Sequence, residues 1–477
     1  MHGSFHDPCF SFNPPLAKHV PPRTQHLPYN EQVTQDTIVA ISTPPGRGGI
    51  GIVRLSGPDA RHTLAPMLRL RHPLAAGHAR FGALLDSEGG TLDEIVATFF
   101  AAPHSYTGED VLEIAAHGAP VILEAIVQQA ITHGARLANP GEFTERAFLS
   151  GRIDLTQAEA VRDLIDAQTL HQARIAAQQM EGALARRIQP VKQALIELIA
   201  ALEAGIDFAE DDIDVMPGSV IAERLAAVTL PLTQLAASFA YGRIVRDGLA
   251  LAIVGRPNAG KSSLFNRLIE RERAIVTATP GTTRDLVSER VSLGGIPVEL
   301  TDTAGLRESA DEAEALGIAK SHEAMADADI VLLVLDATQP LHAGDAALIE
   351  RLQGRPHLVV ANKSDLSVAQ SITAPGIRTS ALTGDGIPAL RDAILTLAGG
   401  SAQQAESGML TNLRQRQAIE SALEGLSRAQ TAVAAAMPHE MLLLDVYAAL
   451  RGLDTLTGAT TADDVLNLIF STFCIGK

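Results

Sequence analysis

The octapeptide Gly255–Ser262, which reads GRPNAGKS, matches the pattern G-x-x-x-x-G-K-S. An apolar segment, residues 249–254, precedes it, and a segment suited to a helix begins at Ser263. A glycine-rich turn between a strand and a helix lets backbone N–H groups surround phosphate oxygens. We expect Lys261 to reach the β- and γ-phosphates of a nucleotide and Ser262 to ligate Mg²⁺. The stretch therefore predicts a parallel α/β nucleotide-binding domain.

Three further motifs follow in the order that a guanine-nucleotide site requires. They are residues 302–305 (DTAG), 362–365 (NKSD) and 380–382 (SAL), each close behind a short apolar segment. The Asp302 carboxylate can hold the magnesium shell, and Asp365 can accept hydrogen bonds from guanine N1 and the 2-amino group. Adenine offers neither donor, and a polar mismatch of that kind discriminates by roughly 10⁴–10⁵-fold. The joint spacing predicts GTP as the ligand.

The segments beside these motifs bear on catalysis. Thr283 is placed to complete the magnesium shell. Leu306 stands where Ras-like enzymes have the glutamine that orients water, so another group must do this. A carboxylate among residues 308–314 can serve, although a solvated acidic helix face explains the same residues. The residues expected to contact GTP are Asn258, Ala259, Gly260, Lys261, Ser262, Ser263, Thr277, Ala278, Thr279, Pro280, Gly281, Thr282, Thr283, Asp302, Thr303, Ala304, Gly305, Asn362, Lys363, Asp365, Ser380, Ala381 and Leu382.

Asn258 is an unusual residue within the phosphate loop. Its amide oxygen could coordinate a monovalent cation beside the phosphates, and backbone carbonyls of residues 277–282 could add to the ligand set. A fixed K⁺ there would neutralise developing charge as an arginine finger does. The alternative is that Asn258 only caps a turn.

Changes in residue composition and in apolar spacing along the chain indicate five segments. Residues 1–34 are expected to be a disordered extension, and 35–151 a small α+β domain with strands at 37–41, 50–55, 95–100 and 111–115 and a helix at 119–133. Residues 152–245 have helical spacing, 246–400 alternate strands with helices, and 401–477 are helical again. The last segment is too short to bury much surface alone, so we expect it to pack on the earlier helices. The α/β domain is then an insertion within one helical domain.

Composition narrows the class of protein. The formal charge of −17 over 477 residues argues against non-specific coating of nucleic acid, but it leaves room for a local basic patch that meets a folded RNA. Cys9 and Cys474 are the only cysteines, which excludes a disulfide framework and a paired-cysteine metal site. No apolar run reaches bilayer length and no secretory core is evident. A soluble cytoplasmic protein without a membrane segment is the simplest interpretation.

The chain ends on Phe473-Cys474-Ile475-Gly476-Lys477. The cysteine has the position of a prenylation box, but a final lysine and a glycine before it do not suit one. The Cys474 thiol could be a nucleophile or a packed residue, and we expect a direct or supporting role in chemistry.

Together these residues resemble the MnmE (TrmE) family of tRNA-modification GTPases. The resemblance runs from Asp36 to Lys477 and rests on the GTPase motifs, the Cys-Ile-Gly-Lys end and residues 43–49, 105–110, 140–144 and 146–149. It implies a multidomain α/β and α fold: an N-terminal α+β tetrahydrofolate-binding domain, a discontinuous helical domain and an inserted Ras-like P-loop GTPase domain. Residues 1–34 have no counterpart in it.

The resemblance also implies an activity and partners. Such proteins are K⁺-dependent GTPases and homodimers that form a heterotetramer with MnmG, which uses FAD and NADH. The pair adds an aminomethyl or carboxymethylaminomethyl group at C5 of the tRNA wobble uridine. The one-carbon unit comes from a tetrahydrofolate derivative in its 5-formyl or methylene form.

Site residues follow from the same resemblance. Asn258, Thr277, Thr279 and Thr282 match the potassium ligands, although Ala278 replaces an expected aspartate. Glu314 matches the glutamate that orients water and joins Lys261 and Cys474 as candidate catalytic residues. Arg54, Glu113, Arg152 and Lys477 match folate contacts, and position 152 is lysine in some relatives. Cationic groups suit a glutamate-tailed anion.

One alternative remains at this point: a ribosome-assembly GTPase that binds ribosomal RNA without chemistry of its own. It predicts a basic RNA-binding module, such as a KH-like domain, after the GTPase domain. The helical pattern of residues 401–477 is not typical of such a module.

Overall fold

The computed structural model describes residues 36–207, 216–271, 287–302, 325–366, 376–399, 408–459, 469–471 and 473–476. Two compact units divide the chain. Residues 36–105 and 109–138 form the first unit, and the other described residues form the second. The predicted extension, residues 1–34, lies outside the described residues.

The first unit is built around a seven-stranded sheet in the order β3-β4-β5-β6-β2-β1-β7. Alternate residues of β5, such as Ile95, Ala97 and Phe99, point into the core and share a buried cluster with Ile126 of α2. The strands expected near 37–41, 50–55, 95–100 and 111–115 are all present, and so is the helix near 119–133, whereas β3 and β4 were not expected. The bounds are β1 Ile38–Ile41, β2 Gly48–Ser56, β3 Leu68–Leu70, β4 Ala79–Leu85, β5 Thr91–Phe100, β6 Val111–Gly118, β7 Arg136–Leu137, α1 Ala60–Thr63, the 3₁₀ helix η1 Ala65–Met67 and α2 Pro120–Thr132.

Helices dominate the second unit on both sides of the α/β insertion. Their bounds are α3 Glu142–Leu149, α4 Leu155–Asp166, α5 Leu170–Met180, α6 Ala183–Asp207, α7 Gly218–Ala237, α8 Phe239–Asp247, α13 Leu413–Ala434 and α14 His439–Thr457. Asp154 and Thr169 begin α4 and α5 with capping boxes, which satisfy backbone N–H groups of the first turn.

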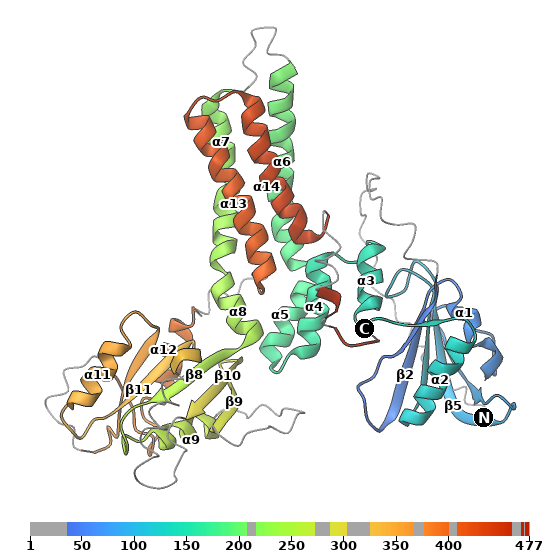
Figure 1. Cartoon of the computed structure of the whole chain (residues 1–477), viewed down its shortest axis with the longest axis horizontal. Coiled ribbons are helices and arrows are strands. Elements are labelled where there is room, and N and C mark those ends of the chain that lie inside the picture. The colour runs from blue at the N-terminus through green and yellow to red at the C-terminus, as the bar shows by residue number, and fades with distance from the viewer. Residues whose placement is uncertain are drawn as a thin grey trace, which may run out of the picture. The chain divides into compact units, whose positions relative to one another are not determined.

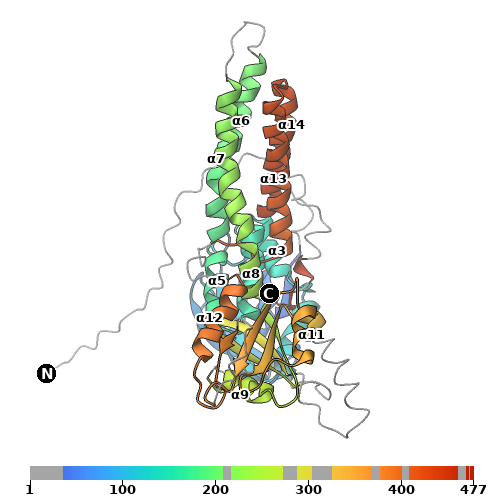
Figure 2. The ribbon, with the colours of Figure 1, turned by 90° about the vertical axis from the view of Figure 1, so that its left-hand side faces the viewer.

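Four of these helices form one bundle. Leu198 of α6, Leu232 of α7, Leu426 of α13 and Leu453 of α14 lie in the same buried cluster. Figures 1 and 2 show the four helices side by side. The segment after the insertion therefore packs on the helices before it, as its small size led us to expect.

One helical stretch in the described part of the chain, Gly218–Asp247, is long and apolar enough to cross a membrane. It covers α7 and α8. Its residues Ile221, Leu225 and Leu235 are buried in the same cluster as residues of α13. Of the most apolar part of this stretch, 28% is buried within the protein.

The insertion contains a six-stranded sheet in the order β13-β12-β11-β8-β10-β9. Neighbouring strands are parallel except for the pair of β9 and β10. The carboxyl ends of parallel strands meet at one edge of a sheet, where open α/β folds bind ligands. The bounds are β8 Leu249–Val254, β9 Val287–Leu293, β10 Ile296–Asp302, β11 Ile330–Asp336, β12 His357–Asn362, β13 Ile377–Arg378, α9 Lys261–Arg271, α11 Ala343–Arg351 and α12 Ile387–Leu397.

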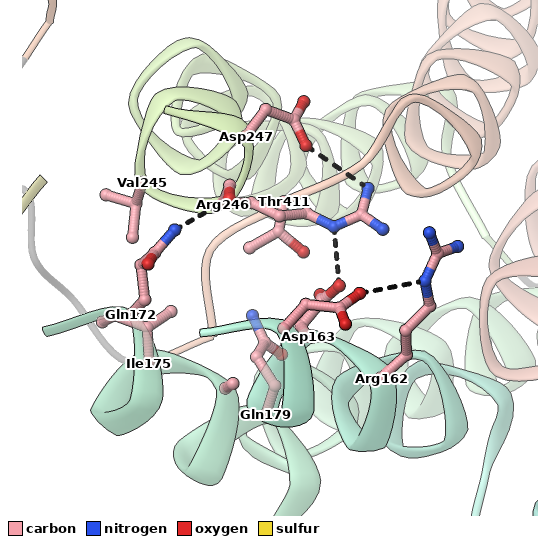
Figure 3. A pocket seen from close by; sticks show the side chains of 11 residues that line it. Arg162, Asp163, Gln172, Ile175, Gln179, Val245, Arg246, Asp247 and Thr411 are labelled. Carbon is pink, nitrogen blue, oxygen red and sulfur yellow. Dashed lines mark hydrogen bonds and ion pairs between the residues drawn. The ribbon is translucent and has the colours of Figure 1, made fainter. Parts of the chain in front are cut away.

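Polar side chains of α4 and α5 hold both crossings between the helices and the insertion. We call this set the junction: Asp163, Gln172, Gln179 and Arg246 (Figure 3). Gln172 Nε2 donates to the Arg246 carbonyl at 2.9 Å, and Gln179 Nε2 donates to the Met409 carbonyl at 2.6 Å. Arg246 Nε also donates to Asp163 Oδ1 at 2.7 Å. Helix α5 thereby contacts the chain where it enters and where it leaves the insertion.

Candidate nucleotide-binding site

The phosphate loop connects β8 to α9, which begins at Lys261. Gly260 has φ +93°, and a Cβ added there would lie 2.3 Å from Nδ2 of Asn362. Only glycine fits a backbone that is left-handed and so close to its neighbour. The tight loop leaves the first N–H groups of α9 without partners in the helix, which is the arrangement that binds phosphate.

Lys261 lies across this loop. Its Nζ donates to the Arg256 carbonyl at 2.9 Å, and the residue is only 8% exposed. Ser262 and Ser263 are exposed at the helix start. An ammonium group held over the loop and hydroxyl groups open to solvent fit a phosphate chain with a metal ion.

Asn362 ties the phosphate loop to the loop that would support the base. It is 1% exposed. Its Nδ2 donates to the Ala259 carbonyl at 3.2 Å, and its Oδ1 accepts from the Ala381 N–H at 3.0 Å. Three motifs that are far apart in the sequence are thus joined through one amide side chain.

The base-recognition carboxylate is also held in place. Asp365 is exposed, and its Oδ1 accepts from Oγ of the buried Ser380 at 2.6 Å. That hydrogen bond restricts the rotamer of the carboxylate while a second oxygen remains to accept from a base. Leu382, at the end of the same loop, is 77% exposed.

Two residues that sequence reasoning missed support the site. Asp336, at the end of β11, accepts from Lys363 Nζ at 2.7 Å and from the Thr338 N–H at 2.9 Å. Burial opposes the charge, but the hydrogen bonds from Lys363 and Thr338 hold the pKa of the Asp336 carboxyl below its usual value. Arg267 Nε donates to the Ala381 carbonyl at 2.7 Å. The position of Asp336 directly after an apolar strand was a signal that could have found it.

Several predicted site residues lie outside the described part of the chain, and for Asp302 only the backbone, at the end of β10, is described. Those outside are Thr277, Ala278, Thr279, Pro280, Gly281, Thr282, Thr283, Thr303, Ala304, Gly305, Glu314 and Lys477. Asn258 is described: it is exposed and has φ +66°.

Similarity to known proteins agrees with this geometry. Residues 155–474 match the family model of the MnmE helical domain, and residues 37–152 match that of the GTP-binding protein TrmE N-terminus. A protein of Koribacter versatilis (strain Ellin345), named tRNA modification GTPase MnmE, is 60% identical over 450 residues, which cover 93% of this chain and 99% of the relative. The chain belongs to the MnmE family. Its nucleotide site is that of a GTP hydrolase.

More distant MnmE proteins cover the chain equally well. The relative from Geotalea uraniireducens (strain Rf4) is 44% identical, with 93% of this chain and 99% of its own length covered. Among solved structures, the G domain of the T. maritima FeoB iron transporter is 26% identical, with 31% of this chain and 98% of that chain covered and a TM-score of 0.24.

The first unit brings together two of the residues that the MnmE resemblance assigned to folate. Arg54 and Glu113 face each other on β2 and β6, with Arg54 Nη2 2.8 Å from Glu113 Oε1. Both side chains are about one quarter exposed. Arg152 belongs to the second unit.

The carboxyl-terminal tail packs within the second unit. Phe470 and Phe473 lie in a buried cluster with Leu155 and Ala158 of α4. Gly141 approaches the tail closely, since a Cβ there would lie 2.6 Å from the Phe470 carbonyl. Beyond these rings Cys474 is exposed. The aromatic anchors therefore hold the tail against α4 and leave the thiol accessible.

Proposed function

We propose that this GTPase drives modification of the tRNA wobble uridine. In this proposal the chain hydrolyses GTP to GDP and phosphate and, with an FAD-dependent partner, adds a carboxymethylaminomethyl or aminomethyl group at C5. Membership of the MnmE family over both its amino-terminal and helical parts carries the proposal. The relatives are named for tRNA modification.

The described half of the nucleotide site fits GTP. Backbone N–H groups at the start of α9 and Lys261 would hold the phosphates, and Asp365 would accept from guanine. The buried Asn362 and Ser380 that fix the base loop support this assignment. Ser262 and Thr283 would ligate Mg²⁺, which neutralises charge on the phosphates when bound.

Potassium dependence is part of the proposal. Asn258, Thr277, Thr279 and Thr282 would hold K⁺, and Glu314 would orient the attacking water. The exposed amide of Asn258, on a left-handed turn, is consistent with a ligand role. GTP hydrolysis should be much faster in K⁺ than in Na⁺, and equal rates would remove the Asn258 assignment. Glu314→Ala should retain GTP binding and lose most turnover.

A tetrahydrofolate derivative would supply the one-carbon unit. Arg54 and Glu113, 2.8 Å apart in the first unit, are proposed as folate-binding residues. Arg152 and Lys477 are proposed as folate-binding residues from the family resemblance. Cys474 would take a direct or supporting part in the chemistry. Cys474→Ser with intact GTP hydrolysis but no modified tRNA would support that part, and full modification would exclude it.

The assembly belongs to the same proposal. We infer a homodimer formed through the first unit, which joins the FAD-dependent partner MnmG in the cytoplasm. Exposed apolar side chains of that unit, such as Ile50 at 69% and Val121 at 73%, support a contact surface there. Light scattering that gives the mass of a monomer at micromolar concentration would contradict the dimer.

Nucleoside analysis of tRNA tests the central claim. A strain that lacks this gene should lose the C5-modified wobble uridine, and the wild-type gene should restore it. Unchanged nucleosides would refute the proposal. The alternative of a ribosomal-RNA switch is not favoured, because the described residues after the insertion include the helices α13 and α14, which pack in the bundle.

A further inference from the structure

Residues 60–85 differ in charge from the rest of the chain. They contain four arginines and three histidines and no aspartate or glutamate, although 55 of the 477 residues are acidic. The segment folds into α1, η1, the edge strand β3, the following loop and β4. A protein with a net charge of −17 therefore places a stretch without any carboxylate of its own at one edge of its first sheet.

Part of this stretch surrounds a surface hollow of about 390 Å³. Arg61, His62, Arg71 and His72 line it over an apolar floor that includes Leu68 and Leu70. We call it the basic groove. All four basic residues are exposed.

The arginines of the stretch are oriented by neutral groups. Arg61 Nη2 donates to the Leu74 carbonyl at 3.3 Å, and its guanidinium lies 5.4 Å from the centre of the Phe99 ring. The Arg71 guanidinium lies 4.8 Å from the centre of the Phe81 ring. Within the described residues, neither arginine forms an ion pair with a carboxylate. The groove keeps its full positive charge and most of its N–H donors.

The same holds for the arginines beside the groove. Arg69 Nη2 donates to Oγ1 of Thr91 at 2.9 Å, and Arg80 Nε donates to the Pro73 carbonyl at 2.8 Å. Neutral anchors reduce the conformational freedom of a guanidinium without neutralising it. A planar fork that is already oriented and has free donors suits bidentate contacts to phosphate.

An open row of cations fits a chain of phosphates better than a single enclosed anion. Phe81 beside Arg71 is 41% exposed, so the rim offers an aromatic face on which an unpaired base can stack. We propose that the basic groove binds the phosphate backbone of the tRNA substrate. The proposal rests on the tRNA-modification function proposed above and names the surface that holds the RNA.

Charged residues on an edge strand also prevent strand-to-strand aggregation. That role predicts aggregation when the arginines are removed, and it predicts no effect on RNA binding by the protein that stays soluble. An anionic membrane is the other partner with phosphate chemistry. Measurements of aggregation and of vesicle binding distinguish these two roles from tRNA binding.

The test measures binding of fluorescently labelled tRNA to the full chain between about 50 and 200 mM salt. The double variant Arg61→Ala/Arg71→Ala should lose roughly tenfold or more in affinity, and its salt slope should fall by about two, because each phosphate contact releases counterions. GTP hydrolysis should stay at the wild-type rate. Arg61→Lys/Arg71→Lys should keep the salt slope and recover part of the affinity.

Arg136→Ala is the matched control, since Arg136 lies in the same unit but pairs with Asp36 at 2.8 Å. It should bind tRNA as the wild type does. Size-exclusion chromatography and circular dichroism establish that each variant is folded and unaggregated.

Unchanged affinity and salt slope in the soluble double alanine variant would overturn the proposal, as would an equal loss in the Arg136→Ala control. Stronger wild-type binding to phosphatidylglycerol vesicles than to tRNA would overturn it as well. Another outcome is that the deletion strain loses the wobble modification while the double variant binds tRNA normally. That result would refute RNA binding by the basic groove and leave the proposed function intact. If the deletion strain and the wild type contain the same amount of unmodified wobble uridine, the proposed function itself is refuted.

Discussion

The nucleotide site and the junction are both polar sites of the second unit, but they differ in how the sequence encodes them. Every described residue of the nucleotide site lies in or beside a loop that follows a strand, with β8, β11 and β12 as the main supports. The junction instead draws its side chains from α4, α5 and α8 (Figure 3). Its backbone partners include Met409, more than two hundred residues from α5.

A phosphate loop is a local device, because its function needs particular residues at fixed spacing along one turn. Asp163 and Arg246 have no such spacing constraint, and they meet only because α4 and α8 pack together.

The largest effect is expected for base recognition at Asp365. Asp365→Asn removes the carboxylate that would accept from guanine, so preference for GTP over xanthosine triphosphate should fall by roughly 10⁴-fold. Competition between the two nucleotides for the full chain measures it. Asp385→Asn, on the loop after β13, is the control and should keep the preference. A preserved preference in Asp365→Asn would remove the guanine assignment.

Lys261 should have the next largest effect. Lys261→Ala removes the ammonium group that lies over the loop, and GTP turnover should drop by roughly 10²–10³-fold. Asn266→Ala, an exposed position on α9, should retain turnover. Steady-state phosphate release gives both rates. A Lys261 variant with normal turnover would mean that the phosphates lie elsewhere.

At the junction the expected change is in stability and not in nucleotide recognition. Arg246→Met leaves the Asp163 carboxylate largely buried without its 2.7 Å partner, which should cost about 3 kcal/mol. The denaturant midpoint should fall while GTP affinity of the folded protein is kept. Arg428→Met breaks a more exposed pair with Asp445 and should cost about 0.5 kcal/mol. Equal midpoints for both variants would show that burial does not strengthen the junction pair.

The smallest effect is a pH dependence at the same place. Burial raises the pKa of the Asp163 carboxyl, more than the neighbouring Arg246 lowers it, and nearby Glu159 raises it further. The stability that Asp163 contributes is then fully present below its unfolded pKa and is lost as the pH rises through its raised folded pKa. Asp163→Asn should flatten that part of the stability curve. Thermal melting from about pH 3 to 7 checks it, and parallel curves for both proteins would contradict the direction.

Most strands were predictable because their local pattern matches their burial. β8 spans Leu249–Val254, the apolar segment expected before the phosphate loop, and β6 and α2 also fall where the pattern placed them. β3 and β4 were missed because Leu68–Leu70 is too short to show a pattern, and β4 has Gly82 followed by three apolar residues in place of a clear alternation. The supporting role of Asp336 was missed because it depends on a hydrogen bond to Lys363, which follows a different strand.

The tail shows the same limit. Its sequence pointed to a special role for Cys474, while the packing of Phe470 and Phe473 on α4 required two segments far apart in the chain to meet. A backbone bridge between Pro140 and Ile475 also joins the tail to the segment before α3. No local pattern encodes a contact of that kind.

Residue spacings along the chain were enough to identify the nucleotide, the α/β class of the insertion and the family, because motifs of that kind are short and local. Tertiary structure alone decided that α6, α7, α13 and α14 share one core, that α5 touches both crossings to the insertion, and that the basic groove lacks carboxylate partners in the described chain. These features depend on packing and on interactions between charges. The residues involved are far apart in the sequence and come together only when the chain folds.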